Sequence, residues 1–275
     1  KSDVHFLVGG TQTNTAVISN ALRIHQGVIC AVSGHINVHE SGAIEATGHK
    51  VLALPSTDGK LTAKQIEECY NNHHNDVCHE HIVQPAMVYI SLPTEGGTIY
   101  TKQELEDIYS VCKKTEMYLY IDGARLGYGL ASEDCNLTLP DVAANCDVFY
   151  IGGTKVGALF GEALVINNDH LKKDFRYVIK QKGGLLAKGR LLGIQFETLF
   201  ENGLYFEISE HAIKCAKKIH DIFDSCGYEF LFDSNTNQQF PILPDSELEI
   251  LSKDFTYDYW CALPDGKSGV RFCAS

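Results

Sequence analysis

Lys155 and Asp122 are the two residues of this sequence whose surroundings most favour chemistry. Lys155 ends a Gly-Gly-Thr-Lys segment that follows the apolar run 148–151. A lysine flanked by glycines at the end of a strand is partly desolvated. Desolvation and nearby positive charge lower the pKa of an amine and make it nucleophilic. Asp122 directly follows the apolar run 118–121 and can hold a proton on a ligand nitrogen. The alternatives are a surface lysine, and an aspartate that caps a helix or pairs with Arg125.

Two further segments carry polar groups at the ends of apolar runs. The segment GGTQTN at 9–14 lies between an expected strand and an expected helix. Backbone N–H groups and threonine hydroxyls at such a helix N-terminus can bind a phosphate. The segment lacks the spacing of the known phosphate motifs, so an ordinary strand-to-helix turn is the alternative. His35 follows the run 28–32 and can be either a structural residue or a platform that stacks on an aromatic ligand.

Taken together, these segments form an ordered set along the chain: an anion site, a histidine, an aspartate and a lysine. A pyridoxal-phosphate enzyme needs a phosphate clamp, a platform for the ring, a carboxylate for the pyridine nitrogen and a lysine for the Schiff base. The set therefore predicts pyridoxal 5'-phosphate as the cofactor.

The ends of several strands must bring these groups together. Short apolar runs predict strands over 4–8, 28–32, 50–54, 86–91, 118–121, 148–151 and 162–166. Helices are expected over 11–22, after a Thr62/Gln65 capping box, over 101–115 and over 139–144. Apolar strands that alternate with helices indicate an α/β fold with a mostly parallel sheet between helices. Open sheets of this kind bind ligands at the carboxyl ends of their strands.

The alternation of apolar runs and helical segments ends after about residue 168. A largely helical stretch follows, and short strands with turn signals return near the C-terminus. We expect a large cofactor-binding α/β domain over 1–175, a helical connection over 176–205 and a smaller α+β domain over 206–275.

Composition excludes several classes of protein. Lys plus Arg number 23 and Asp plus Glu number 35, which gives a net charge of −12, and no basic patch suited to nucleic acid is present. No apolar run approaches the roughly 18 residues that span a bilayer. The 10 cysteines form no CxxC pair and fit reduced thiols in the cytoplasm. The segment HHNDVCHEH at 73–81 lacks the spacing of a zinc site, so we favour a solvated loop over a metal site.

Four stretches of the sequence resemble the threonine aldolase and aromatic amino acid β-eliminating lyase family. They are GGTQTNT at 9–15, GHINVHESGAIEATGHKV at 34–51, YIDGARLGYGL at 120–130 and GGTKVGALFGEALV at 152–165. The resemblance implies a fold-type-I pyridoxal-phosphate enzyme with a seven-stranded sheet and a small C-terminal domain. It also implies a homodimer or homotetramer with shared active sites, and cleavage of L-threonine or L-allo-threonine to glycine and acetaldehyde.

The resemblance also assigns roles to single residues. It makes Lys155 the Schiff-base lysine, Asp122 the partner of the pyridine nitrogen and His35 the platform under the ring. Gly10 and Thr11 would bind the phosphate.

The same resemblance implies two anchors for the substrate carboxylate. Arg125 would lie beside both the cofactor and the substrate, and Arg271, in the segment Ser268–Phe272, would be the second anchor. A solvated surface charge is the alternative for Arg271. Lys182 and Lys188 flank a glycine-rich turn and are candidates for contacting the phosphate of a neighbouring subunit, or they form a solvated basic face.

Two features depart from the family pattern. The sequence begins almost at the phosphate loop, where family members have an N-terminal arm, and it stops soon after Arg271. In addition, many aldolases carry a histidine where this chain has Glu95, which could act as the base only with a raised pKa or through water. The alternatives are therefore a β-eliminating lyase acting on another amino acid and a non-catalytic homologue that binds the cofactor.

Overall fold

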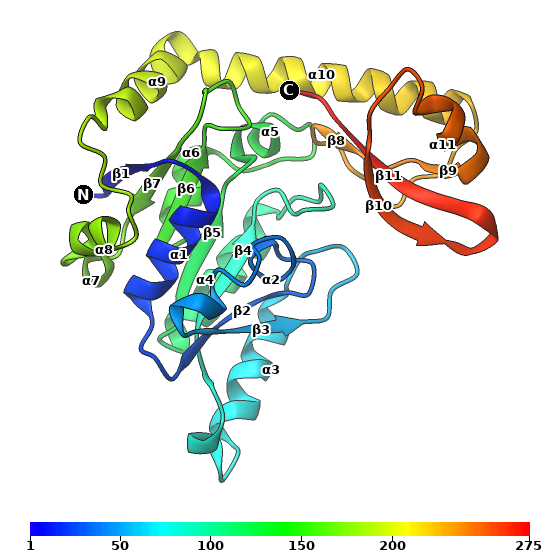
Figure 1. The fold of residues 1–275 in the computed structure, drawn as a ribbon. Helices are drawn as coiled ribbons and strands as arrows, with labels where there is room; N and C mark the ends of the chain where they lie inside the picture. Colours follow the sequence, from blue (N-terminus) through cyan, green and yellow to red (C-terminus); the bar gives the residue numbers. More distant parts are fainter.

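The larger part of the protein is built on one seven-stranded sheet (Figure 1). The computed structural model describes residues 1–275. The strands are β1 (Asp3–Leu7), β2 (Gln26–Ala31), β3 (Lys50–Leu54), β4 (Gln84–Ser91), β5 (Tyr118–Asp122), β6 (Val148–Gly152) and β7 (Glu162–Ile166). Their order is β1-β7-β6-β5-β4-β2-β3. Strand β7 runs in the opposite direction to all the others and is therefore antiparallel to both of its neighbours, β1 and β6. The expected mostly parallel sheet of seven strands is thereby confirmed.

Strand β5 shows why these apolar runs form central strands. Successive side chains on a strand point to opposite faces of the sheet. Leu119 and Ile121 enter the core on one face, whereas Tyr120 enters the core on the other. A strand buried on both faces needs a continuous apolar run, as the central strands of parallel sheets do.

Helices cover both faces of the sheet. The first face packs against α1 (Gly10–Ala21), α2 (His35–Val38), α7 (Asp169–Lys172) and α8 (Phe175–Gln181). The second face packs against α3 (Ala63–His74), α4 (Lys102–Lys114), α5 (Leu126–Leu130), α6 (Leu139–Ala144), α9 (Arg190–Phe200) and α10 (Leu204–Ser225). The expected capping box of Thr62 and Gln65 is present at the start of α3, and Thr101 and Glu104 form a second one at α4. Short 3-10 turns span Glu45–Thr47, His79–His81, Glu201–Gly203 and Pro264–Gly266.

A small antiparallel sheet follows the long helix α10, which runs along the top of the molecule in Figure 1. The sheet consists of β8 (Gln238–Gln239), β9 (Ile242–Pro244), β10 (Asp258–Leu263) and β11 (Lys267–Cys273), with α11 (Asp245–Leu251) beside it. Leu243, Leu248 and Val270 form its core. The short strands expected near the C-terminus are present here, together with a helix. The division at residues 175 and 205 stays a prediction, because α10 packs on α5 as well as on β8 and β11.

The structure contains neither a membrane-spanning helix nor a cluster of metal ligands. No helix of the chain is both long and apolar enough to cross a membrane. The histidine-rich segment 73–81 forms the end of α3 and a 3-10 turn. Nowhere in the chain do three or more His, Cys, Asp or Glu side chains gather as a metal site requires.

Candidate active site

A cavity of about 180 Å³ lies at the carboxyl edge of the large sheet. It brings together nearly all the residues singled out from the sequence, which come from the ends of five strands and the loops after them. They are Gly10, Thr11, His35, Glu95, Asp122, Arg125 and Lys155. The candidates Arg271, Lys182 and Lys188 do not line the cavity.

The first turn of α1 forms one wall of this cavity. No side chain caps the helix at Gly9, so the N–H groups that open the helix face the cavity beside Gly10 and Thr11. A Cβ atom on Gly10 would lie 3.1 Å from the Tyr150 hydroxyl, so glycine lets the backbone pass close to that ring. An uncapped helix N-terminus offers N–H donors and partial positive charge to an anion.

Asp122 lies buried on the floor of the cavity, where four donors meet its carboxylate. Tyr150 and the N–H of Ala124 donate to Oδ1, at 2.5 and 3.0 Å. Tyr89 donates to Oδ2 at 2.5 Å, and Asn14 approaches the same oxygen at 3.4 Å. A carboxylate has about four lone-pair positions, so the four donors occupy those of Asp122 and fix the position of its side chain.

The register of the strands explains this arrangement. Ser91 is the partner of Asp122 across β4 and β5, and Tyr89 is the partner of Tyr120. Tyr120 and Asp122 are two residues apart, so both point to the face that α1 covers. A buried tyrosine hydroxyl needs a hydrogen-bond partner, and Tyr120 finds Asn14 Oδ1 of α1 at 2.6 Å.

A second chain of hydrogen bonds leads from Asn14 to His35. The Asn14 amide donates to Glu40 Oε1 at 2.6 Å, and the same oxygen lies 2.8 Å from His35 Nδ1. The Glu40 carboxylate thus fixes the imidazole at the mouth of the cavity. The other oxygen of Glu40 is buried without a partner.

Lys155 lies in the tight connection between β6 and β7. Its backbone carbonyl accepts a hydrogen bond from the Tyr128 hydroxyl, and the residue lines the cavity. Burial lowers the pKa of this amine, and the positive charge of Arg125 lowers it further. A lysine with a lowered pKa is a better nucleophile near neutral pH.

Glu95 is placed by contacts on two sides. One carboxylate oxygen accepts from the Ser91 hydroxyl at 2.7 Å and from the N–H of His35 at 2.9 Å. Burial raises the pKa of the Glu95 carboxyl. A raised pKa is consistent with a role for Glu95 as a base, and that role stays a prediction.

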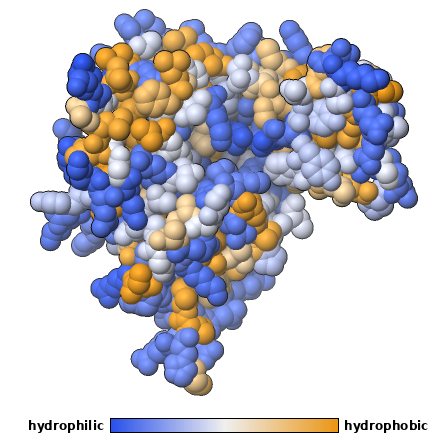
Figure 2. Space-filling view, viewed as in Figure 1, coloured by the Kyte–Doolittle hydropathy of each residue, from blue (hydrophilic) through white to orange (hydrophobic).

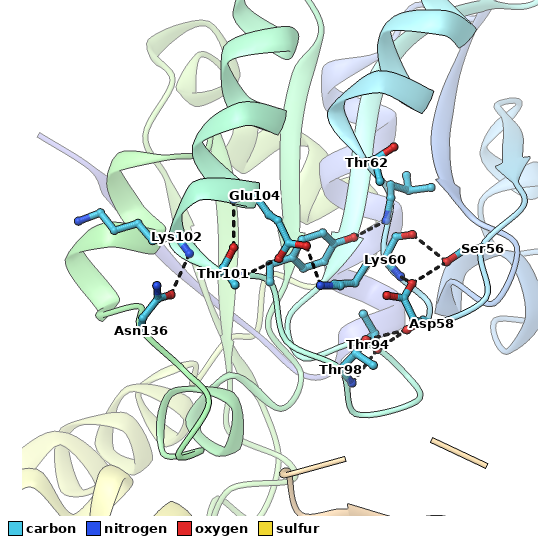
Figure 3. Close-up of polar contacts among 12 residues, drawn as sticks. Ser56, Asp58, Lys60, Thr62, Thr94, Thr98, Thr101, Lys102, Glu104 and Asn136 are labelled. Carbon is cyan, nitrogen blue, oxygen red and sulfur yellow. Dashed lines mark hydrogen bonds and ion pairs between the residues drawn. The ribbon is translucent and has the colours of Figure 1, made fainter. Parts of the chain in front are cut away.

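The loop that carries Glu95 is held on one side by the segment 56–62 (Figure 3). Thr98 donates to the carbonyl oxygen of Asp58 at 2.6 Å, and Thr94 bonds to Thr98 at 2.6 Å. Lys60 reaches across to Glu104 at the start of α4, at 2.7 Å. These contacts fix the loop to the segment 56–62, and Lys60 fixes that segment to the start of α4.

The same loop is held on its other side by the C-terminal part of the chain. Gly97 has a φ of +83°, and a Cβ atom there would lie 2.1 Å from the Ser234 hydroxyl, so only glycine fits. The buried side chain of Gln238 donates to the carbonyl oxygen of Glu95 at 3.4 Å. The position of Glu95 therefore depends on both parts of the molecule.

The two arginines expected to bind substrate differ in their surroundings. Arg125 lines the cavity and takes part in none of the ion pairs of the structure. Arg271 lies on β11 outside the cavity and is paired with Asp258 at 2.7 Å. Arg271 also donates to Gln238 at 3.1 Å and lies over the ring of Trp260. Its role as a substrate anchor stays a prediction and requires an exchange of partners.

The Lys182 candidate lies near the start of α1 at residues 9–11, which we call the phosphate cradle, and Lys188 is exposed. Gln12 of α1 donates to the carbonyl oxygen of Lys182 at 3.2 Å, which holds the glycine-rich turn after it against α1. Contacts of either lysine with a neighbouring subunit stay a proposal.

Five residues that matter for the geometry were not found from the sequence. They are Asn14, Glu40, Tyr89, Tyr150 and Glu162. For the tyrosines a signal was available: a hydroxyl in an apolar, doubly buried strand must find a polar partner. The other three depend on contacts between distant segments.

The residues of the cavity fit pyridoxal phosphate. The uncapped start of α1 suits its phosphate, and a buried carboxylate and a lysine line the same small space. The weakest of the four donors to Asp122 is Asn14 at 3.4 Å, so a ring N–H can replace it without breaking a short hydrogen bond. The roles assigned to single residues stay proposals.

Comparison with known proteins identifies related chains. The family model described as Beta-eliminating lyase matches residues 1–244. A low specificity L-threonine aldolase from Pseudomonas sp. is 32% identical over 276 residues, which cover 99% of this chain and 78% of that protein. A solved threonine aldolase from Leishmania major is 49% identical with a TM-score of 0.97, covering 100% of this chain and 79% of that one.

A more distant structure shows the breadth of the fold. An aspartate aminotransferase variant from Thermus thermophilus has a TM-score of 0.70 at 12% identity, over 98% of this chain and 71% of that one. At that identity it shows the fold alone, which is the fold-type-I arrangement expected from the sequence. The family match and the full-length relatives show that this chain belongs to the β-eliminating lyase family.

Proposed function

We propose that this chain cleaves L-threonine or L-allo-threonine to glycine and acetaldehyde with pyridoxal phosphate as cofactor. The chain is a pyridoxal-phosphate-dependent lyase by family. Its threonine aldolase relatives match it over its full length. The observation that carries the proposal is the meeting of Lys155, Asp122 and the start of α1 in one cavity.

In this proposal the residues of the chain divide into those that hold the cofactor and those that handle the substrate. Bound pyridoxal phosphate supplies an electron sink for the charge left on the α-carbon when a bond to it breaks. Lys155 holds the cofactor covalently, Asp122 accepts a hydrogen bond from its ring nitrogen, and Gly10 and Thr11 bind its phosphate. His35, fixed by Glu40, forms the platform under the ring.

Arg125 and Glu95 are the proposed residues on the substrate side. Arg125 has no ion-pair partner within the chain and can bind the α-carboxylate of an amino acid through a bidentate contact. Threonine cleavage requires a group that takes the proton of the β-hydroxyl as the Cα–Cβ bond breaks. Glu95, with its raised pKa, can accept that proton near neutral pH.

We also propose that the chain works as a homodimer or homotetramer in the cytoplasm. Figure 2 shows apolar surface at the upper left, over the region of α9. The exposed apolar side chains of this region are Leu185, Leu186, Leu191, Ile194, Phe200 and Leu204. A surface of this kind is typical of a protein–protein contact. All ten cysteines are free, which suits a reducing compartment.

The test is a product assay on the purified chain with added pyridoxal phosphate and threonine. We expect acetaldehyde and glycine in equal amounts. Pyruvate or another keto acid together with ammonia would instead indicate β-elimination, the reaction that gives the family its name. Cofactor binding without any product would leave a non-catalytic binder and overturn the proposal. The same assay is applied to Lys155→Ala, which should form no product. Lys173→Ala, which replaces an exposed lysine outside the cavity, is its control.

A further inference from the structure

Glu162 lies at the cavity because of the direction of β7. Since β7 runs antiparallel to β6, the first residue of β7 lies at the same edge of the sheet as the last residues of its neighbours. Glu162 is the partner of Leu7 on β1, two residues before Gly9 of the cradle. Its side chain is 4% exposed and lines the cavity. The carboxyl group thus lines the same cavity as the start of α1 and Lys155.

The surroundings of Glu162 do not neutralise a negative charge well. One oxygen accepts from the N–H of Gly153 at 3.1 Å, and no ion pair of the structure includes the residue. Burial raises the pKa of its carboxyl to about 7, because it outweighs the hydrogen bonds from the Thr154 side chain and the Gly153 N–H, which lower the pKa. The charge of Asp122 also raises this pKa, and that of Lys155 lowers it.

The other neighbouring elements bring no further cation. The buried phenols of Tyr120, Tyr150 and Tyr205 are the remaining titratable groups that sense the charge of Glu162. Leu7 is its partner on β1, and α1 contains no titratable side chain at all. The start of α1 and Lys155 are therefore the positive features that a ligand phosphate would find beside Glu162.

We propose that Glu162 controls phosphate binding through its protonation: as a neutral acid it donates a hydrogen bond to the cofactor phosphate, and as a carboxylate it repels that phosphate. The inference rests on the proposed cofactor site. The lining carries four carboxyl groups (Glu40, Glu95, Asp122 and Glu162) against the cations Arg125 and Lys155, and a phosphate dianion adds to this negative excess. Like charges in a buried site favour a proton on one of them.

The direction of the pH effect follows from linkage. A bound dianion stabilises the protonated form of Glu162, so the bound state holds the proton to a higher pH than the free protein does. Cofactor affinity is then highest below the carboxyl pKa of about 7 in the free protein and falls as the pH rises above it. The phosphate group itself has a second pKa of about 6 and is a dianion throughout the falling range.

The experiment measures binding of pyridoxamine 5'-phosphate to the full chain by calorimetry between pH 7 and pH 9.5. This probe has no aldehyde, so no covalent bond to Lys155 forms. We expect the affinity of the wild-type chain for this probe to fall about tenfold over this range. Each unit by which binding raises the carboxyl pKa of Glu162 corresponds to a tenfold loss of affinity at high pH. Glu162→Gln keeps the acceptor for Gly153 and should remove most of this fall. Glu197→Gln, an exposed carboxylate outside the cavity, should leave the fall unchanged.

Two comparisons separate Glu162 from its neighbours. Pyridoxamine without a phosphate should bind wild type and Glu162→Gln with the same pH dependence. Because Lys155 also titrates in the cavity, the binding of the phosphate probe is repeated in Lys155→Ala, where the fall should persist. This second variant also tests the proposal if Glu162→Gln does not fold.

The outcomes distinguish this inference from the proposed function. A fall of equal size in Glu162→Gln, or loss of the fall in Lys155→Ala, would overturn the role of Glu162 and leave the cofactor site standing. Failure of the phosphate probe to bind at any pH would overturn both.

Discussion

The Asp122 end and the Arg271 end of the site are built in opposite ways. Asp122 is 4% exposed, lies in the central strands and accepts four donors that are all in place without a ligand. Arg271 lies on the small sheet, and its side chain is paired with Asp258, which is itself 61% exposed.

The difference teaches which part of the site is preformed. The cofactor end is fixed by hydrogen bonds within the core, so a ligand finds its partners already oriented. At the other end Arg271 must leave Asp258 before it can bind a substrate carboxylate. We therefore expect mutations at the first end to affect turnover, and mutations at the second to affect mainly KM.

The largest effect is expected from Lys155→Ala. Alanine keeps the backbone carbonyl that accepts from Tyr128, so the fold should be retained while covalent attachment of the cofactor is lost. Turnover of threonine should fall to the level of the blank, and the visible absorption of lysine-bound cofactor should vanish. The measurements are an absorbance spectrum, a product assay and a melting curve. Retained absorption with retained activity would remove Lys155 from its role.

Asp122→Asn tests the preformed end directly. An amide keeps the shape but cannot balance a proton on the ring nitrogen, so the cofactor becomes a weaker electron sink. Turnover should fall by roughly a hundredfold or more, a loss typical of removing one preorganised electrostatic contact. Steady-state kinetics with saturating cofactor measure it. If the variant were as active as the parent, Asp122 would serve only the fold.

Arg271→Lys tests the other end of the comparison. Lysine keeps the charge but not the bidentate geometry of arginine. Loss of one charged hydrogen-bonded contact corresponds to roughly 1.5–3 kcal/mol, or about one to two decades in kcat/KM, expressed mainly in KM for threonine. Arg125→Lys is the matched variant within the cavity and should disturb cofactor affinity as well. Unchanged threonine kinetics would place Arg271 outside the site.

Asp258→Asn should give the smallest effect and in the opposite direction. Removing the carboxylate frees Arg271 from a partly exposed ion pair, whose contribution is about 0.2–1 kcal/mol. KM for threonine should therefore fall by up to about fivefold with kcat unchanged. A rise in KM would mean that Asp258 positions Arg271 instead of competing for it.

The parts of the site that follow strands could be predicted from the sequence. Asp122 comes directly after an apolar run, and parallel strands end at one edge of a sheet, so its place at that edge, beside the end of β4, follows from local patterns. The same reasoning placed Lys155 after β6. These residues needed only the type and direction of the strand that precedes them.

The residues that could not be predicted depend on pairings between distant segments. The direction of β7 is not encoded in its apolar run, and it decides that the start of this strand, with Glu162, faces the cavity. Asn14 and Glu40 meet because α1 and the segment after α2 pack on the same face of the sheet. Asp258 reaches Arg271 only through the register of β10 on β11.

The position of β1 at the edge of the sheet has a consequence for folding. The hairpin of β6 and β7 is local in sequence, so it can form with little loss of chain entropy. Strand β1, which is made first, has its only partner in β7, far along the chain. Contacts of such long sequence separation form slowly. We therefore expect the cradle to be completed late, after synthesis has passed β7, so that a nascent chain acquires its cofactor only once most of the sheet exists.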